Sequence, residues 1–305
     1  MAAKQRLVDY SDSDTSDVEA EPPAKLRKTN DSGLPPLPSR FHDLYAVPPR
    51  MAKDDDPALH GGRKRAIPHV QGNWPTHVFI EWHLTRIEFD ALDKSYTRAK
   101  GVGEGGDWRL ESHLISELGS ELPLHLSLSR PNVLRTEQRE GFLETLAERY
   151  HKARVKPFTV VFDGFEWVGN QDRTRWFLVL KASAGPKSEL ARLLELTNHT
   201  FAVFNQPGLY GPNGNSTDGF HVSLAWSLTE PSAEDKRKVA DELIAHGMKD
   251  GTIVLEGGDG ENTRLRMDVS GIKVKIGNAV HLVELGTGKL EVVELTGKRK
   301  ASVGS

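Results

Sequence analysis

Two short stretches of the chain, "LHLSLS" at residues 124–129 and "FHVSLAW" at residues 220–226, carry the pattern His-x-Ser on an apolar background. Side chains two positions apart on an extended strand lie on the same face, so each stretch presents one imidazole and one hydroxyl together. These polar side chains are His125 and Ser127, and His221 and Ser223. The alternate positions are apolar and predict that the other face of each strand packs on a core; they are Leu124, Leu126 and Leu128, and Val222, Leu224 and Trp226.

Composition narrows the class of protein. Only 37% of the 305 residues are hydrophobic, which is low for a wholly folded chain and predicts a disordered part. The absence of cysteine excludes disulfides, cysteine-ligated zinc and thiol catalysis, and it fits a reducing compartment. No apolar run approaches the roughly 20 residues that span a bilayer, so we expect a soluble intracellular protein with no membrane partner. The net charge of −3 means that a nucleic acid would have to be held by a local site.

The chain divides by composition into three regions. Residues 1–75 are acidic and proline-rich without either periodicity, and we expect them to be disordered. Basic clusters at 25–28 and 63–65 are typical either of nuclear-import signals or of a solvated linker. Residues 76–287 are predicted to form the folded domain, and 288–305 a basic tail.

Within the folded domain, strands alternate with helices. The patterns predict strands at 77–84, 124–129, 157–168, 175–182 and 220–226, helices at 85–100, 107–118, 136–153, 187–204 and 232–247, and closing strands after residue 250. "GVGEGG" at 101–106 matches G-x-G-x-x-G but follows a helical pattern and not a strand, so it does not predict a dinucleotide site. A unit of strand, turn, helix and strand occurs twice. It predicts an α+β domain of two pseudo-symmetric lobes, with antiparallel sheets and flanking helices around a central cleft, across which the two imidazoles face each other.

Two histidines and two serines around a cleft are suited to general acid–base catalysis on a phosphodiester. Imidazole titrates near neutrality, so one ring can accept a proton from the nucleophile while the other protonates the leaving oxygen. The hydroxyls can donate to the phosphate oxygens. Without a metal to activate water, the ribose 2′-OH is the most accessible nucleophile, because it adjoins the phosphate. Its attack leaves a 2′,3′-cyclic phosphate and restricts the reaction to RNA.

Histidines in such strands can also have structural or metal-binding roles. A single histidine on an apolar strand is more often a core residue than a catalyst, and it is the duplication that favours catalysis. A zinc site from His125 and His221 would need further ligands at close spacing, which are missing, so we expect no metal and no cofactor. The other histidines lack the pattern, and His77 or His83 is predicted to be structural.

The paired motif resembles that of the two-histidine (2H) phosphoesterase superfamily. "LHLSLSRP" and "FHVSLAW" are similar to the Usb1/Mpn1 branch, the U6 small nuclear RNA phosphodiesterases, and the resemblance extends from about residue 74 to 285. It implies a nuclear 3′-to-5′ exoribonuclease that trims the oligouridine 3′ end of U6 snRNA without a metal and leaves a cyclic or an opened 3′ phosphate. The uridine preference follows from the resemblance alone.

The resemblance also implies roles for individual residues. His221 would be the general base toward the 2′-OH, and His125 the general acid toward the leaving 5′-oxygen. Ser127 and Ser223 would hold the phosphate.

The resemblance further implies an aromatic residue, shortly before the second motif, that stacks on the terminal base. Tyr210 is the candidate, although "GPNGNSTDG" at 211–219 lengthens the connection to His221 relative to the family pattern. The alternative for Tyr210 is an ordinary loop-packing role.

Two alternative functions remain open at this point. A different 2H enzyme would use the same residues with water as the nucleophile to open a cyclic phosphate on a small nucleotide. A non-catalytic RNA-binding splicing factor would use the histidines only to contact phosphate. In each case we expect a monomer.

Overall fold

The computed structural model describes residues 70–185, 187–210, 219–249, 252–256, 262–286 and 292–295. Most of the predicted N-terminal region, with both basic clusters, lies outside the described residues. So do residues 211–218 of the lengthened connection and most of the predicted tail.

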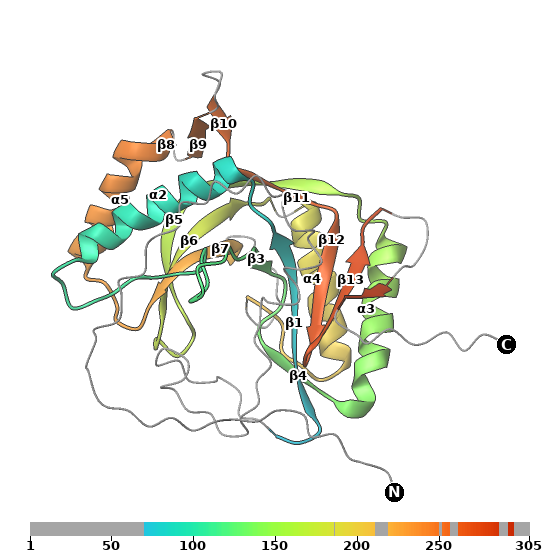
Figure 1. The fold of residues 1–305 in the computed structure, drawn as a ribbon. Coiled ribbons are helices and arrows are strands. Elements are labelled where there is room, and N and C mark those ends of the chain that lie inside the picture. The colour runs from blue at the N-terminus through green and yellow to red at the C-terminus, as the bar shows by residue number, and fades with distance from the viewer. Residues whose placement is uncertain are drawn as a thin grey trace, which may run out of the picture. The chain divides into compact units, whose positions relative to one another are not determined.

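An antiparallel sheet runs through the whole described domain, and its central strands carry the two His-x-Ser motifs (Figure 1). In spatial order its strands are β11 (Arg266–Val269), β5 (Phe158–Gly169), β6 (Trp176–Ser183), β7 (His221–Ser227), β3 (Leu124–Ser127), β1 (Asn73–Trp82), β12 (Gly271–Ile276), β13 (Ala279–Glu284) and β14 (Val292–Glu294). Two short strands pair alongside: β2 (Glu111–Ser112) with β7 and β4 (Asn132–Arg135) with β1. The α+β class with antiparallel pairing is confirmed, and the two predicted lobes share one continuous sheet.

Four α-helices among the described residues flank the sheet. They are α2 (Arg86–Gly103), α3 (Arg139–Ala153, preceded by the 3₁₀ turn η2, Thr136–Gln138), α4 (Glu189–Val203) and α5 (Ala233–Gly247). Helices α2 and α5 lie together beside the half that contains β5 and β6, whereas α3 and α4 lie beside β12 and β13 (Figure 1). A second, three-stranded sheet consists of β8 (Met248–Lys249), β9 (Thr252–Glu256) and β10 (Asn262–Arg264).

One hydrophobic core joins the apolar faces of the central strands to the helices. Val78 and Ile80 of β1, Leu126 of β3 and Val222 of β7 are all at most 1% exposed, and they belong to the same cluster as the apolar stripes of α2 to α5. Strand side chains alternate between faces, so the His-x-Ser side chains point away from this core. The core therefore supports the sheet from one side and leaves the polar face for the site.

The helix predicted over 107–118 is wrong. Helix α2 continues into the predicted breaker at 101–106 and ends there at Gly103, and the chain then turns at Gly105, whose φ of +97° favours glycine. Beyond this turn the backbone pairs with β7 through β2 and through the N–H of His113, which donates to the carbonyl of Leu224. Tertiary pairing with a strand edge thus overrides the local helical pattern.

Two strand details also differ from the predicted pattern. Strand β1 begins at Asn73, four residues earlier than predicted, because Asn73–Thr76 pairs with β4. In β7, the register against β6 shifts between Ser223 and Ala225. This bulge lets Leu224 and Ala225 both enter the core cluster. Trp226 is buried, as predicted, but lies outside that cluster.

The C-terminal end of the described chain adds to the edge of the sheet. Strand β14 pairs with β13 and lies within the segment predicted as a tail. No helix within the described part of the chain combines the length and the apolar character needed to cross a membrane.

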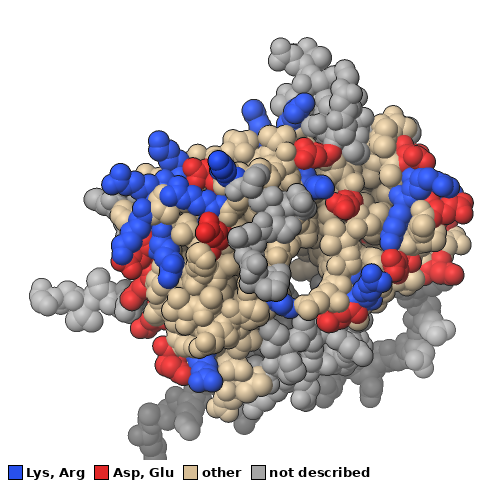
Figure 2. Space-filling model, turned by 180° about the vertical axis from the view of Figure 1, so that it is seen from behind, with Lys and Arg blue, Asp and Glu red and all other residues tan. Residues whose placement is uncertain are grey.

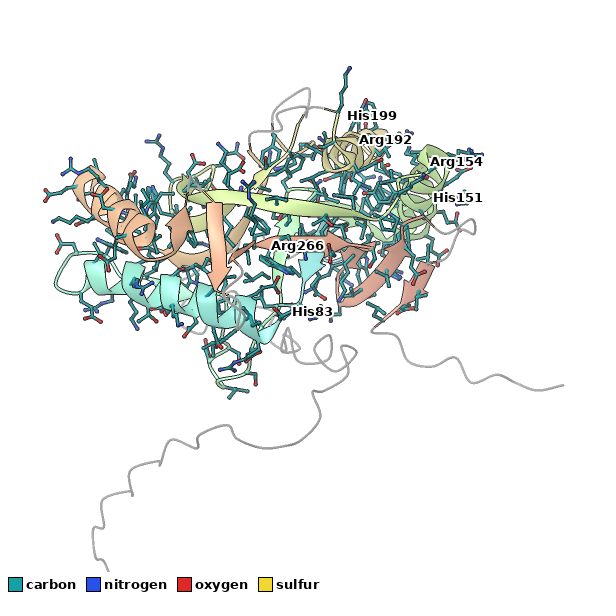
Figure 3. All side chains as sticks on the ribbon, turned by 90° about the horizontal axis from the view of Figure 1, so that it is seen from above. His83, His151, Arg154, Arg192, His199 and Arg266 are labelled. Atoms are coloured by element: carbon teal, nitrogen blue, oxygen red, sulfur yellow. The ribbon has the colours of Figure 1, made fainter. Side chains whose placement is uncertain are left out.

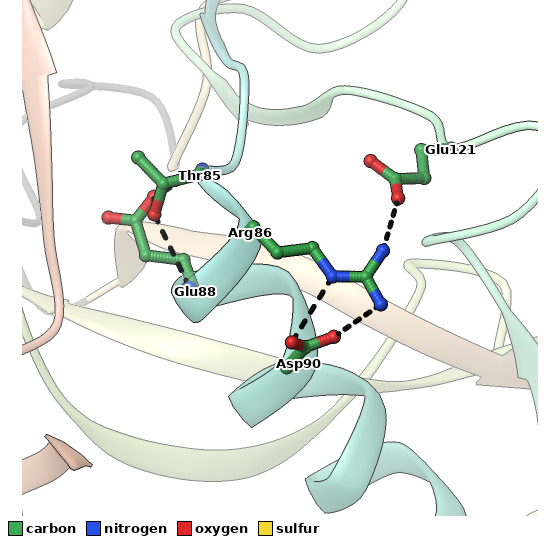
Figure 4. Close-up of polar contacts among 5 residues, drawn as sticks. All are labelled: Thr85, Arg86, Glu88, Asp90 and Glu121. Atoms are coloured by element: carbon green, nitrogen blue, oxygen red, sulfur yellow. Dashed lines mark hydrogen bonds and ion pairs between the residues drawn. The ribbon is translucent and has the colours of Figure 1, made fainter. Parts of the chain in front are cut away.

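The connection from β1 to α2 is fixed by a capping box (Figure 4). The backbone N–H of Glu88 donates to the Thr85 hydroxyl at 3.3 Å, and the N–H of Thr85 donates to the Glu88 carboxylate at 2.7 Å. Two backbone donors that the first helical turn would leave unsatisfied are thereby paired. The neighbouring Arg86 makes ion pairs with Asp90 and Glu121, but its side chain is 71% exposed.

Replacing Thr85 with alanine should lower the free energy of unfolding by about 1 kcal/mol, because the helix loses its N-cap acceptor. Arg86→Ala is the matched control one residue away, and it should cost clearly less, since exposed ion pairs contribute little. Chemical denaturation of both variants measures the difference. Equal losses in the free energy of unfolding would show that the capping box stabilises the protein no more than the exposed ion pairs do.

Candidate functional site

The two His-x-Ser strands are direct neighbours in the sheet. Strands β3 and β7 pair antiparallel with Leu126 opposite Val222. Extending this register by one residue in each direction sets each histidine opposite the serine of the other strand. The two histidines then occupy diagonal positions, and residues so placed lie about 7–8 Å apart. All four predicted polar side chains are therefore brought to one face.

The four side chains remain accessible from this face. His125 is exposed, and Ser127, His221 and Ser223 are half-buried. The two imidazoles are close enough to interact, since the positive charge of His221 lowers the pKa of His125. A phosphate lying on this face can meet both rings and both hydroxyls.

A half-buried carboxylate lies next to His125. Glu81 of β1 is opposite His125 in the strand register, and it forms an ion pair with Lys273 of β12 and a 2.6 Å contact with His83. Burial raises the pKa of Glu81, but hydrogen bonds from His83 and Lys273 outweigh it and hold that pKa below its usual value. Glu81 is therefore ionised at neutral pH.

The pKa of His125 reflects opposing effects. Although solvent reaches the side chain, loss of water to the surrounding protein is the largest effect and lowers the pKa, while Glu81 raises it. The net pKa lies below the usual histidine value. Without Glu81 the imidazolium would be still less stable at this position.

His221 is oriented by a backbone carbonyl. Its Nδ1 lies 2.6 Å from the carbonyl oxygen of Gly219, which can only accept, so Nδ1 carries the proton and Nε2 presents its lone pair. Desolvation lowers the pKa of His221, and this carbonyl and Glu166 of β5 raise it. Lys181 of β6 is opposite His221 in the strand register, and its Nζ lies 3.9 Å from Oε2 of Glu166.

Tyr210 contacts the same carbonyl. Its hydroxyl donates to the Gly219 oxygen at 2.5 Å, and its ring packs edge-to-face on the fully buried Phe220 with ring centroids 5.7 Å apart. Burial raises the pKa of the Tyr210 phenol, which therefore stays protonated and donates. A Cβ on Gly219 would approach the Tyr210 ring to 2.6 Å, so the close contact requires glycine. Tyr210 thus lies beside the second motif; its stacking on a base stays a prediction.

A third histidine, His77 of β1, also lies on this face, which the sequence patterns did not indicate. Its Nε2 is 3.1 Å from the Ser127 hydroxyl, and its ring stands edge-to-face with His125 at 5.5 Å. The available signal was the alternation of His77, Phe79 and Glu81 with the buried Val78 and Ile80 along β1. That alternation places His77 on the polar face.

Histidines elsewhere are separate from this constellation. His151 on α3 and His199 on α4 are exposed, and both lie away from His83, His199 at the top of the view and His151 at its right (Figure 3). No group of three or more His, Cys, Asp or Glu among the described residues is arranged to hold a metal ion. On the face seen in Figure 2, Lys and Arg lie among Asp and Glu, so this face has no continuous basic field.

Comparison with known proteins gives a consistent set of relatives. A family model, "HVSL: Uncharacterised conserved protein", matches residues 35–284. A Neurospora crassa protein named U6 snRNA phosphodiesterase 1 is 34% identical over 285 residues, covering 86% of this chain and 78% of that relative. The Homo sapiens protein of the same name is 27% identical over 287 residues, covering 89% of this chain and 95% of that relative.

A solved structure has a similar fold. The structure of Kluyveromyces marxianus Usb1 matches with a TM-score of 0.50 at 16% identity, covering 69% of this chain and 98% of that one. At this identity the likeness concerns the fold alone.

The carbonyl of Gly219 should fix the tautomer of neutral His221. ¹⁵N NMR of the imidazoles above their pKa should show His221 protonated at Nδ1, with His221→Gln used to assign the signal. Protonation at Nε2 would contradict the geometry of this hydrogen bond.

Proposed function

Since this chain belongs to the U6 snRNA phosphodiesterase 1 family, we propose that it is a metal-independent 3′-to-5′ exoribonuclease that trims the 3′ end of U6 snRNA. The observation that carries the proposal is the antiparallel pairing of β3 and β7, with Leu126 opposite Val222. This register brings two imidazoles and two hydroxyls to one accessible face, which is the set of groups that phosphodiester cleavage by a 2′-OH requires.

In the proposed reaction, His221 is the general base. Its Nε2 takes the proton of the 2′-OH of the penultimate ribose as the 2′-oxygen attacks the adjacent phosphorus. The hydrogen bond from Nδ1 to Gly219 supports this role, because it leaves the Nε2 lone pair free and stabilises the imidazolium that forms.

His125 is the general acid. The bond from phosphorus to the 5′-oxygen of the terminal nucleoside breaks, and protonated His125 transfers its proton to that oxygen. Glu81, ionised and opposite His125, favours the charged imidazolium that this step consumes. The products are a released nucleoside and an RNA shortened by one nucleotide with a 2′,3′-cyclic phosphate.

Ser127 and Ser223 hold the phosphate during this step. Each can donate one hydrogen bond to a non-bridging oxygen, where negative charge increases in the transition state. The same four groups can open the cyclic phosphate if water takes the position of the departed nucleoside, with the two histidines exchanging roles. The 3′ end is then a phosphate.

The proposal extends to the setting of the reaction. A small nuclear RNA substrate implies a nuclear enzyme, and one chain contains all four proposed groups, so a monomer suffices. The proposed uridine preference and the stacking of Tyr210 on the terminal base rest on the family resemblance.

Purified protein with oligouridine in EDTA should shorten the RNA stepwise. Replacing His125 or His221 with alanine should lower kcat/KM by about 10²–10⁴ each, because each removes one proton-transfer group. His199→Ala on the exposed surface of α4 is the control and should leave the rate unchanged.

Other outcomes of this experiment separate the alternatives. Inert RNA together with hydrolysis of a 2′,3′-cyclic nucleotide would indicate a different two-histidine activity. RNA binding without turnover, unaffected by the alanine variants, would indicate a binding factor. Mass analysis of the trimmed 3′ end distinguishes a cyclic from an opened phosphate.

The carboxylates beside the two histidines predict opposite pH effects. Glu81 raises the pKa of His125, so Glu81→Gln should lower that pKa. At alkaline pH, where the general acid must stay protonated, kcat/KM should then fall several-fold. At acid pH it should not change. Glu166 raises the pKa of His221, so Glu166→Gln should increase kcat/KM at acid pH, where the base must be neutral, with no change at the alkaline end. Effects on the opposite limbs would reverse the acid and base assignments.

A further inference from the structure

The third histidine of the polar face, His77, has no role in the reaction as proposed so far. It lies in the middle of β1, where its backbone is fixed by pairing with Lys275 of β12. Its ring stacks on Phe79 with centroids 5.0 Å apart at 23°, and its Nε2 lies 3.1 Å from the Ser127 hydroxyl. The imidazole is therefore held in one orientation by an aromatic ring and directed at a proposed phosphate-binding group.

The surroundings of His77 keep it neutral. The groups that face it are the imidazole of His125 at 5.5 Å on β3 and the ammonium of Lys275 on β12, both positive when charged. Burial, followed by the charges of His125 and Lys275, lowers the pKa of His77 to about 3. At this low pKa the ring is a weak base and is uncharged at neutral pH, so it is poorly suited to the proton transfers assigned to His125 and His221. It still has one N–H donor and one acceptor nitrogen.

The single proton of the Ser127 hydroxyl decides what His77 must do. If this proton points to His77, Ser127 offers the phosphate only lone pairs, which repel its anionic oxygens. If His77 donates from Nε2 to the serine oxygen, the hydroxyl proton is free to be donated to the phosphate. Only the second arrangement makes Ser127 useful for binding an anion.

We propose that His77 is a positioning residue for the phosphodiesterase reaction, which donates from Nε2–H to the Ser127 oxygen and thereby directs the Ser127 hydroxyl proton at the phosphate. The inference rests on the proposed function, because it assumes that Ser127 holds the scissile phosphate. It assigns His77 no contact with the reacting atoms.

Substitutions at His77 can separate the donor from the shape of the ring. His77→Phe keeps the planar ring between Phe79 and His125 but removes the donor, and it should lower kcat/KM for oligouridine about 10–100-fold. His77→Gln offers an amide N–H near the position of Nε2 and should restore a substantial part of the loss. His281→Phe is the matched control, since His281 is a half-buried histidine of the same sheet, opposite Val274 of the core; it should leave kcat/KM unchanged.

A double-mutant cycle tests whether the effect passes through Ser127. In the Ser127→Ala background, His77→Phe should cost little further activity, because no hydroxyl remains to be oriented. Fully additive losses, or a glutamine variant as inactive as the phenylalanine variant, would overturn the proposal. Melting temperatures of all variants show whether lost activity reflects lost folding.

Spectroscopy of the unmodified protein gives a second measurement that does not depend on a folded variant. ¹⁵N NMR should show neutral His77 protonated at Nε2, and protonation at Nδ1 would overturn the proposal. The outcome is distinguishable from failure of the proposed function itself. If His125→Ala and Ser127→Ala retain full activity, the site is not the phosphodiesterase centre; if they are inactive and His77→Phe is not, only the role of His77 fails.

Discussion

The pairing of Leu126 with Val222 across β3 and β7 is the contact on which the site depends. Within the described sheet, this is the one residue pair that defines the register of β3 against β7. A slip of one residue would turn the polar side chains of one strand into the core. The apolar residues on both strands oppose such a slip, because it would expose them to water. The same hydrophobic pattern that folds the sheet therefore aligns the four polar groups.

The four motif side chains lie on strands and not on loops, and this limits how far they can move relative to one another. Groups on paired strands that pack on a shared core are held by many contacts, so their relative positions vary little. The ion pair between Glu81 and Lys273 requires partial desolvation of both charges, and such pairs seldom increase stability over apolar packing. Because Glu81 also lies beside His125 and raises its pKa, the ion pair bears on the electrostatics of the site more than on the stability of the fold.

The sequence predicts which side chains share a face within one strand, but it does not predict which strands are neighbours in the sheet. Two-residue spacing alone predicts that each histidine shares a face with its serine, and the repeated unit predicts the two halves. The strand order, which joins β1 to β3 and β3 to β7, depends on contacts between distant segments. Alternation along β1 indicates the face on which His77 lies, but its contact with Ser127 and the effects of Glu81 and Glu166 on the histidines could not be predicted. The prediction for the 107–118 segment was wrong for a related reason, because pairing with an edge strand overrides the local helical periodicity. The bulge in β7 likewise brings Ala225 into the core cluster in place of Trp226, which is buried outside it.

The near-symmetry of the two motifs does not extend to their partners, and the difference bears on which histidine acts as acid. His125 has an ionised carboxylate, Glu81, directly opposite on the neighbouring strand, which favours the protonated ring, whereas the carboxylate that acts on His221, Glu166, lies on β5 with β6 between them. His221 donates from Nδ1 to a carbonyl that is itself held by the Tyr210 hydroxyl, so its free nitrogen is Nε2 and carries a lone pair. A ring with a fixed lone pair is suited to accept a proton, and a ring beside an anion is suited to arrive charged. Two equivalent strands thus acquire opposite roles from the residues next to them, which supports the proposed direction of proton transfer.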